Sequence, residues 1–374
     1  MKKKIGILGS TGSIGRQTLD IIERFPDRFE VVLLSAYNNS QLLYEQISKF
    51  KPQRVAGKNL LSCQGVSVYS LSALENPDFY QSCDLIINGI SGIAGLLPSI
   101  AVLQARVTLA TANKESIVAA GEFVLDTASK YATRIIPVDS EHSALMQCIC
   151  GEEVSRLIIT ASGGAFRDYT NEMLSTATYT DALKHPTWDM GSKVTIDSAT
   201  LMNKGFELVE AKWLFGVDDI DVLLHRESVV HAMAVFRDGT TRMCLSRPDM
   251  HLPIQYALTY PERAECLPQV DINMLNNITF SSVNIDRFPC LKLGFETLKR
   301  PSLGAVLVAA DEVAVSLFAS NKIGFLEIPK LLETTLGHFE SAIPKNVADV
   351  LDIVAATKNY ALNYNIHGGI KKCY

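Results

Sequence analysis

The residue types best suited to chemistry are concentrated in one segment of this chain, residues 197–210, which reads DSATLMNKGFELVE. Ten residues of this segment place a hydroxyl, an amide, an ammonium and a carboxylate close together, on Ser198, Asn203, Lys204 and Glu207. The first three groups donate hydrogen bonds to an anion, and a helix N-terminus adds positive potential. The carboxylate is a hard oxygen ligand for a divalent cation. The segment therefore predicts a site for a phosphorylated substrate that also touches a metal ion.

The same segment is expected to contain the start of a helix. Asp197 and Ser198 are good N-cap residues. The apolar positions that follow repeat at helical spacing, at Met202, Phe206, Val209 and Trp213. On such a helix, Asn203 and Lys204 share a neighbouring face with Glu207. The alternative is a capped surface helix with an ordinary Lys–Glu pair.

A glycine-rich turn near the N-terminus predicts a dinucleotide site. Residues 9–15 read GSTGSIG, between a short apolar strand and a helical segment. Glycines let the backbone approach a pyrophosphate, whose charge then lies at the helix N-terminus. An ordinary strand–helix turn is the alternative, and the immediately preceding strand favours the cofactor.

The end of the second predicted strand bears on which dinucleotide is used. An NAD enzyme usually places Asp or Glu there to hold the ribose hydroxyls. Residues 36–40 read AYNNS instead, so the acid is missing. Its absence favours NADP, although no Arg or Lys stands there to meet a 2′-phosphate. Asn38, Asn39 and Ser40 supply neutral hydrogen bonds only.

Length and composition fit an intracellular enzyme. The 374 residues predict two or three domains, and 47% hydrophobic residues are ample for large cores. A net charge of −5 argues against nucleic acid as a main partner. Eight cysteines without a C-x-x-C pair suggest reduced thiols, with Cys148 and Cys150 in the core rather than on zinc. The apolar runs are too short to predict a signal peptide or a membrane span, so we expect a cytoplasmic protein.

The order of the predicted elements indicates three domains. Up to residue 138, apolar strands alternate with helical segments, which predicts an α/β fold with a Rossmann-like, doubly wound parallel sheet. Residues 139–265 mix strands with the helix described above and predict a central α/β catalytic domain. Residues 266–290 read as a linker. Residues 291–374 predict a C-terminal helical bundle that lacks polar constellations and acts as a scaffold.

Ligands of a doubly wound sheet bind beyond the carboxyl ends of its strands, and two polar segments stand there. Residues 112–116 read ANKES and follow the strand predicted at 108–111. Residues 139–142 read DSEH and follow the strand predicted at 135–138. Both segments are therefore expected to face bound ligands.

Two acids of the second segment predict a metal site. Asp139 and Glu141 are two residues apart, and in an extended chain both carboxylates point the same way. They repel each other unless a cation lies between them. With Glu207 they form a three-carboxylate set suited to Mg²⁺ or Mn²⁺. The alternative is a capping Asp139 and an exposed Glu141, and His142 is more simply structural.

Two loops add further groups. Ser162 precedes two glycines after the strand predicted at 156–160, which offers a hydroxyl and backbone N–H groups to an anion. A plain glycine turn is equally compatible with that stretch. Residues 184–191 read KHPTWDMG, a loop of the type that closes over a site, with Trp188 at its centre. Trp188 could equally anchor a buried loop.

Together these motifs resemble the 1-deoxy-D-xylulose 5-phosphate reductoisomerase family, in order and over nearly the whole chain. The stretches that carry the resemblance are residues 9–15, 112–116, 138–142, 162–164, 185–191, 197–207 and 288–293. The resemblance implies a homodimeric enzyme that uses NADPH and a divalent metal. Its reaction would convert 1-deoxy-D-xylulose 5-phosphate to 2-C-methyl-D-erythritol 4-phosphate in the non-mevalonate isoprenoid pathway.

The resemblance also implies a role for individual residues. The metal ligands would be Asp139, Glu141 and Glu207. The substrate phosphate would be held by Ser162, Ser198, Asn203 and Lys204, with His185 close by. Ser140 and Lys114 would meet the reacting oxygens, and Trp188 would lie on a lid. The NADPH contacts would be Thr11, Gly12, Ser13, Ile14, Asn38, Asn113, Glu115 and Gly191.

The chain departs from the family pattern at a few places. Family members often carry a basic residue near Asn38. The family's His-Pro-Gln-Ser run appears as His225-Arg226-Glu227-Ser228, Ala165 replaces a common Pro, and Cys244-Leu245-Ser246-Arg247 replaces a glycine-bearing approach to Pro-Asp. We expect these three changes to alter packing or dimer contacts rather than activity.

Two other functions remain open at this point. One is a phosphosugar dehydrogenase without isomerisation, which would form no branched product. The other is a NADP-binding regulatory protein with an idle second domain, which would need no metal.

Overall fold

The computed structural model describes residues 1–61 and 65–363, which form two compact units. The first unit consists of Met1–Ser116, Val124–Met146 and Asp249–Gln269. The second consists of Ile117–Phe123, Gln147–Pro248 and the described chain from Val270 onward. Each unit contains its own sheet.

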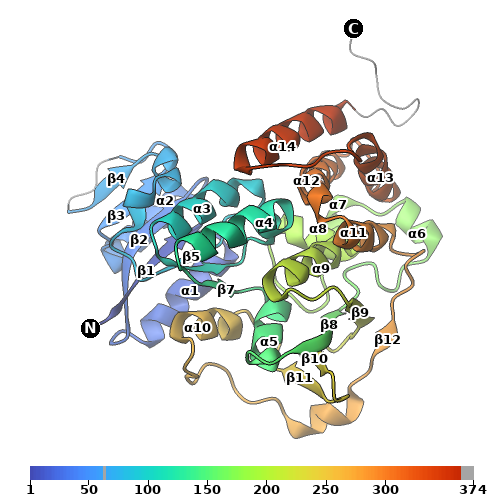
Figure 1. Ribbon diagram of the computed structural model, residues 1–374, viewed down its shortest axis with the longest axis horizontal. Helices are drawn as coiled ribbons and strands as arrows, with labels where there is room; N and C mark the ends of the chain where they lie inside the picture. Colours follow the sequence, from blue (N-terminus) through green and yellow to red (C-terminus); the bar gives the residue numbers. More distant parts are fainter. Residues whose placement is uncertain (62–64, 364–374) are drawn as a thin grey trace. The chain divides into compact units, whose positions relative to one another are not determined.

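The first unit is built on a seven-stranded sheet of order β4-β3-β2-β1-β5-β6-β7, in which every neighbouring pair is parallel (Figure 1). Its strands are β1 (Lys3–Leu8), β2 (Phe29–Ala36), β3 (Arg54–Gly57), β4 (Ser67–Tyr69), β5 (Leu85–Asn88), β6 (Thr108–Thr111) and β7 (Ile135–Pro137). The Rossmann-like parallel sheet is confirmed. The sequence pattern missed β3 and β4, which lie together at one edge of this sheet.

Helices connect these strands, and one helix follows the last of them. They are α1 (Ser13–Arg24), α2 (Ser40–Phe50), α3 (Leu96–Gln104), α4 (Lys114–Lys130) and α5 (Ser140–Ile149), with short 3₁₀ turns η1 (Leu71–Glu75), η2 (Pro77–Tyr80) and η3 (Ile93–Gly95). A later helix, α10 (His251–Thr259), packs against α1, and its Leu258 carbonyl accepts a hydrogen bond from Lys3 Nζ at 2.9 Å. Ile254 and Leu258 are fully buried in the same core as Ile5. Segment 249–269, placed by its sequence at the end of the central domain and in the linker, thus packs with the first unit.

The second unit is built on a five-stranded mixed sheet of order β11-β10-β8-β9-β12. Its strands are β8 (Val154–Ala161), β9 (Ile220–Leu224), β10 (Val230–Phe236), β11 (Thr241–Leu245) and β12 (Ser281–Ser282). β8 and β9 are parallel, and the other pairs are antiparallel. β12 and the 3₁₀ turn η4 (Ile272–Asn277) lie in the segment expected to be a linker, so that stretch contributes to the sheet.

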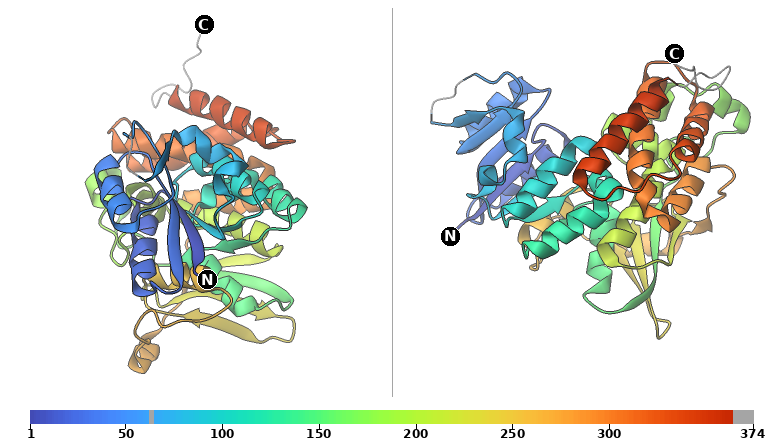
Figure 2. Two further views of the ribbon diagram at one scale, coloured as in Figure 1. Left: turned by 90° about the vertical axis from the view of Figure 1, so that its left-hand side faces the viewer. Right: turned by 45° about the horizontal axis from the view of Figure 1, so that its top comes forward.

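Ten further elements belong to the described part of the second unit. They are α6 (Asn171–Ser175), α7 (Tyr179–Ala182), α8 (Ser192–Thr200), α9 (Met202–Phe215), α11 (Pro289–Lys299), η5 (Pro301–Leu303), α12 (Gly304–Ala319), η6 (Phe325–Glu327), α13 (Ile328–His338) and α14 (Val347–Leu362). Figure 2 shows α12, α13 and α14, in orange to red, packed side by side. By length and composition alone Pro301–Ala319 could cross a membrane, but 78% of its apolar stretch of 18 residues is buried, as in the core helix of a folded domain.

The C-terminal helices do carry a polar constellation, so that part of the prediction is wrong. Asp311 of α12 is fully buried and accepts a hydrogen bond from Lys193 Nζ at 2.7 Å. The same ammonium donates to Asp197 at 2.6 Å, and both residues lie on α8. Breaking a buried ion pair typically costs about 3–5 kcal/mol. The triad therefore fastens α8 to the helical bundle.

The cysteine pair 148–150 is only partly in the core. Cys148 is 4% exposed. Cys150 is exposed, and its φ of 49° together with Gly151 at φ 80° turns the chain after α5. The Cys150 side chain therefore leaves the core where the helix ends.

Candidate active site

The glycine-rich turn of the first unit links β1 to α1 and is closely packed. Gly9 has φ +75°, and a Cβ atom there would lie 2.8 Å from the carbonyl oxygen of Gly89. A Cβ on Gly15 would lie 2.4 Å from the Gly9 carbonyl oxygen. Gly12 is the N-cap of α1 and has no side chain to cover the first turn. The first N–H groups of the helix therefore remain available to an anion, as a pyrophosphate site requires.

Asn113 organises the neighbouring strand ends. Its Nδ2 donates to the carbonyl oxygens of Ile90 and Gly92, each at 2.8 Å, and its Oδ1 accepts from the N–H of Ser116 at 3.3 Å. It also donates to Glu115 at 3.2 Å. The side chain thus caps α4 and holds the turn after β5 at the carboxyl edge of the sheet. Direct contact of Asn113 and Glu115 with a cofactor stays a prediction.

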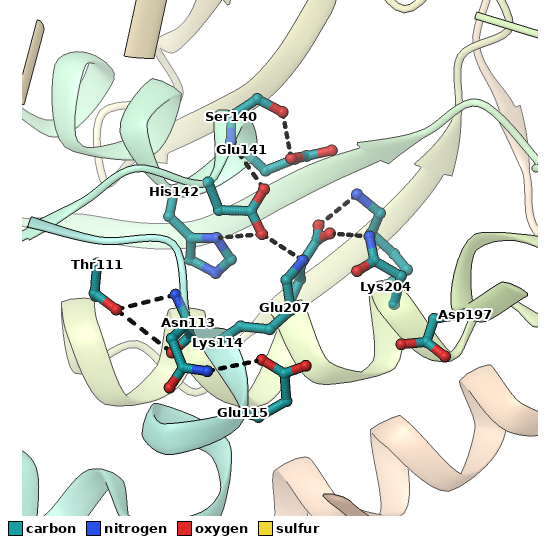
Figure 3. A network of polar contacts seen from close by, with 12 residues as sticks. Thr111, Asn113, Lys114, Glu115, Ser140, Glu141, His142, Asp197, Lys204 and Glu207 are labelled. Atoms are coloured by element: carbon teal, nitrogen blue, oxygen red, sulfur yellow. Dashed lines mark hydrogen bonds and ion pairs between the residues drawn. The ribbon is translucent and has the colours of Figure 1, made fainter. Parts of the chain in front are cut away.

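Asp139 and Glu141 stand where β7 ends and α5 begins. Figure 3 shows Ser140, Glu141 and His142 at this turn. Lys114 Nζ forms an ion pair with Asp139, and the Ser140 N–H donates to Asp139 Oδ1 at 2.9 Å. Ser140 Oγ donates to Glu141 Oε2 at 2.6 Å. His142 is fully buried, with Nδ1 3.9 Å from Asp139 Oδ2. Four of the predicted groups thus meet within the first unit.

The sequence predicted that an extended backbone would point the Asp139 and Glu141 carboxylates the same way, but the backbone here is different. Because α5 begins at Ser140, Glu141 lies in the first helical turn and not in an extended segment. Asp139 supplies the carbonyl that accepts the first helical hydrogen bond, from the N–H of Ser143 at 2.8 Å. Both carboxylates therefore lie at a helix N-terminus, where the helix dipole favours negative charge.

In the second unit, segment 197–210 is divided between two helices. Ser198 lies in the last turn of α8, Leu201 follows with φ 58°, and α9 begins at Met202. The prediction that Asp197 and Ser198 cap the helix is therefore wrong. The N-cap of α9 is Leu201, and the hydroxyl of Thr200, the last residue of α8, accepts the Met202 N–H at 3.1 Å.

The polar groups of α9 gather around one buried carboxylate. Asn203 Nδ2 donates to Glu207 Oε1 at 2.5 Å, and Lys204 Nζ forms an ion pair with Oε2. Lys204 is 4% exposed and Glu207 is fully buried. Burial of a carboxylate is costly unless it is paired and hydrogen-bonded, and both oxygens of Glu207 have such a partner. The predicted amide, ammonium and carboxylate are thus brought together.

The Ser162 turn is connected to the 184–191 loop through His185. His185 Nδ1 accepts the N–H groups of Thr187 at 3.1 Å and Trp188 at 2.9 Å, so this nitrogen carries no proton. The proton is then on Nε2, which donates to Ser162 Oγ at 3.0 Å. Burial, and secondly the charge of Arg167, lower the pKa of His185 to about 4. The serine hydroxyl proton consequently remains free to point to another acceptor.

We expect His185 to stay neutral down to about pH 4 in the free protein, because burial and then the charge of Arg167 lower its pKa. Protonation at Nδ1 would also break two backbone hydrogen bonds. Its folded pKa lies below the unfolded value of about 6.5. The local structure is therefore fully stabilised above pH 6.5 and loses stability as the pH falls towards 4. Nitrogen NMR of the imidazole reports both pKa and tautomer, and a titration near pH 6.5 would contradict this assignment.

Close backbone packing joins the Ser162 turn to α8. Gly164 has φ +70°, and a Cβ atom there would lie 2.3 Å from the carbonyl oxygen of Ser198. The turn therefore lies directly on the last turn of α8, which brings two predicted phosphate ligands into one region. Gly191, predicted to touch the cofactor, is the N-cap of α8.

One residue of this region was missed by the sequence interpretation. His231, on β10, is 5% exposed, and its ring lies 6.1 Å from the ring of Trp188. Its Nε2 is 2.9 Å from Ser246 Oγ. The sequence shows His231 only as a lone histidine in an apolar strand. That pattern does not reveal its contact with Trp188, 43 residues earlier in the chain.

Comparisons with known proteins agree with these motifs. Three family models match in chain order: 1-deoxy-D-xylulose 5-phosphate reductoisomerase at residues 5–121, its C-terminal domain at 135–215, and the DXP reductoisomerase C-terminal domain at 245–360. The 1-deoxy-D-xylulose 5-phosphate reductoisomerase of Bacillus cereus (strain Q1) is 43% identical, over 96% of this chain and 99% of the relative. This chain belongs to the 1-deoxy-D-xylulose 5-phosphate reductoisomerase family.

A second relative and two solved structures extend the match. The reductoisomerase of Thermoanaerobacter pseudethanolicus is 44% identical over 94% of this chain and 96% of its own. A DOX-P reductoisomerase in complex with NADPH, fosmidomycin and magnesium has a TM-score of 0.90 at 31% identity, over 96% of this chain and 97% of that one. The Zymomonas mobilis reductoisomerase in complex with NADPH has a TM-score of 0.88 at 36% identity, over 97% and 98%. The reductoisomerase fold therefore extends over nearly all of both chains.

Proposed function

We propose that this chain catalyses the NADPH- and divalent-metal-dependent conversion of 1-deoxy-D-xylulose 5-phosphate to 2-C-methyl-D-erythritol 4-phosphate. Family membership over the whole chain supports the reaction. The observation that assigns the reaction to particular residues of this chain is the clustering of polar side chains at the family's motifs. Asp139 is paired with Lys114 in one unit, and Glu207 with Lys204 in the other.

We further propose that Asp139, Glu141 and Glu207 hold one Mg²⁺ or Mn²⁺ ion. Three carboxylates are the donor set that such hard cations prefer. In the protein alone, Lys114 and Lys204 supply the positive charge that a cation would bring to these acids. The bound metal would act as a Lewis acid on the substrate ketone.

The remaining roles follow from the donors in each unit. Lys114 would stabilise negative charge on the reacting oxygens, and Ser140 would hydrogen-bond to one of them. The substrate phosphate would lie among donors of the second unit, on Ser162, Ser198, Asn203 and Lys204. His185 would orient the Ser162 hydroxyl through the 3.0 Å contact. NADPH would bind at the carboxyl edge of the parallel sheet, with its pyrophosphate at the start of α1.

One coupled assay tests the reaction. We expect NADPH oxidation on addition of 1-deoxy-D-xylulose 5-phosphate, loss of that activity with a chelator, and recovery with Mg²⁺. Product analysis should find the branched tetritol phosphate. A linear product would point to the simpler phosphosugar dehydrogenase, and oxidation unaffected by the chelator would contradict the metal assignment.

We expect Trp188 to report closure of the 184–191 loop. The chain has only Trp188 and Trp213, and the indole of Trp213 lies against Gly121, where an added Cβ would lie 2.4 Å from it. Fosmidomycin, which a related structure contains, should therefore change the intrinsic fluorescence of the wild type. The change should vanish in Trp188→Phe and persist in Trp213→Phe. An unchanged wild-type signal would count against a lid.

We propose a cytoplasmic homodimer, as the family resemblance implies. The edge strand β11 of the second sheet exposes Met243 and Leu245, with 49% and 38% of their surfaces accessible. Apolar side chains on an unpaired edge favour association with another surface. Light scattering of the purified protein should give a mass near twice 41.0 kDa, and a monomer at micromolar concentration would refute the dimer.

A further inference from the structure

A positive charge stands beside the end of β2, although the sequence around Asn38 contains none. β2 and β3 are parallel neighbours, and their last residues, Ala36 and Gly57, are register partners. The residues that follow them are Tyr37 and Lys58, so both leave the sheet at the same carboxyl edge. Lys58 Nζ lies 5.2 Å from the centre of the Tyr37 ring, within cation–π range.

This edge is connected to the glycine-rich turn. The Ser35 carbonyl accepts the Ser10 N–H at 2.8 Å, and the Ser35 hydroxyl accepts the Gly9 N–H at 3.4 Å. In a dinucleotide-binding sheet the pyrophosphate lies on that turn and the adenosine ribose beside the end of β2. The Tyr37–Lys58 pair therefore stands where the ribose hydroxyls of a bound dinucleotide would be.

Few other groups at this position can meet a phosphate. Asn39 Oδ1 accepts the Leu42 N–H at 3.0 Å and is committed to capping α2. Asn38 is exposed but neutral. Lys58 is exposed and charged, and an ammonium is a natural partner for a phosphate dianion.

We propose that Lys58 binds the 2′-phosphate of NADPH and is the residue that makes this chain prefer NADPH to NADH. Lys58, at the end of β3, supplies the positive charge that is missing at Asn38, at the end of β2. Tyr37 holds the ammonium at the edge of the sheet. The inference rests on the proposed use of NADPH and assigns its specificity to a residue outside the family's motifs.

Direct binding of the two cofactors, without substrate, tests the assignment. In Lys58→Ala we expect the Kd for NADPH to rise by roughly tenfold while the Kd for NADH stays unchanged, because only NADPH carries the extra phosphate. The NADPH affinity of the wild type should also fall more steeply with salt than that of the variant. Lys49→Ala is the matched control, since Lys49 is an exposed lysine over the ring of Phe50, at 5.6 Å, and should leave both constants unchanged.

A second variant, which should regain NADPH binding, shows that the loss in Lys58→Ala is not a folding defect. Asn38→Arg, introduced into Lys58→Ala, should restore NADPH affinity by returning a base to the end of β2. An unchanged NADPH Kd in Lys58→Ala, or an equal loss for both cofactors, would overturn the role of Lys58. Failure of the wild type to bind NADPH at all would instead contradict the proposed function.

Discussion

Glu207→Gln should lower turnover by roughly 1000-fold, equivalent to about 4 kcal/mol of transition-state stabilisation, and leave NADPH binding intact. Glu207 is a fully buried carboxylate of α9. Glutamine has the same shape and still accepts a hydrogen bond, but it lacks the charge that binds a divalent cation. The variant should therefore still fold, with some loss of stability because the buried Lys204 loses its charged partner, and lose metal affinity together with Lewis-acid catalysis.

Three measurements separate this result from a folding defect. We expect a lower melting temperature with a single cooperative transition, because Lys204 loses its buried ion-pair partner, together with a much weaker Kd for Mn²⁺ and an unchanged Kd for NADPH. Glu296→Gln, an exposed change on α11, should keep full activity. Turnover near that of the wild type at saturating Mg²⁺ would remove Glu207 from the metal site.

Lys204→Ala should lower kcat/KM for 1-deoxy-D-xylulose 5-phosphate by roughly 10- to 100-fold. A hydrogen bond from a charged donor is worth about 1.5–3 kcal/mol, and each 1.4 kcal/mol is a factor of ten. Lys204 lies in the first turn of α9 next to Asn203, so two donors stand close to a positive helix end. Loss of the ammonium should therefore weaken recognition of the substrate phosphate.

The difference between the phosphorylated and the phosphate-free substrate distinguishes phosphate binding by Lys204 from a structural role. Lys204 is also the ion-pair partner of buried Glu207, so its removal should lower the melting temperature as well. The phosphate-free sugar should be a poor substrate of the wild type and hardly poorer for the variant. Lys212→Ala, on the same helix but paired with Asp218 near the surface, is the matched control. An equal loss with both substrates would make Lys204 structural or catalytic rather than a phosphate ligand.

Much of this protein was determined by local sequence patterns. Alternation of apolar strands with helical segments predicted five strands of the parallel sheet, because period and glycine placement reflect short-range backbone sterics. The turn at residues 9–15 was predicted for the same reason, since the close approaches of Gly9 and Gly15 exclude a side chain. The chemistry of the acids at 139–141 and of residues 203–207 followed from residue type.

Helix boundaries inside segment 197–210 were decided by tertiary packing. The sequence offered Asp197 and Ser198 as capping residues, and local propensity does not reveal that both lie inside a helix that ends at Thr200. In the folded chain Asp197 is held by Lys193, which also pairs with Asp311 from α12. The N-cap position of α9 is Leu201, whose φ of 58° separates the two helices, and the Thr200 hydroxyl accepts the Met202 N–H.

Contacts between distant segments were beyond the reach of the sequence. The pairs Lys58–Tyr37, His185–Ser162 and Asp311–Lys193 each join residues from different elements. Strand register brings Lys58 to Tyr37. The 184–191 loop folds onto a glycine turn and so brings His185 to Ser162, and burial of a long apolar helix brings Asp311 to Lys193. Local patterns report which face of an element is apolar but not which element covers it. The sequence by itself therefore determined the elements and the kinds of chemistry they carry, and the tertiary structure decided which charges meet.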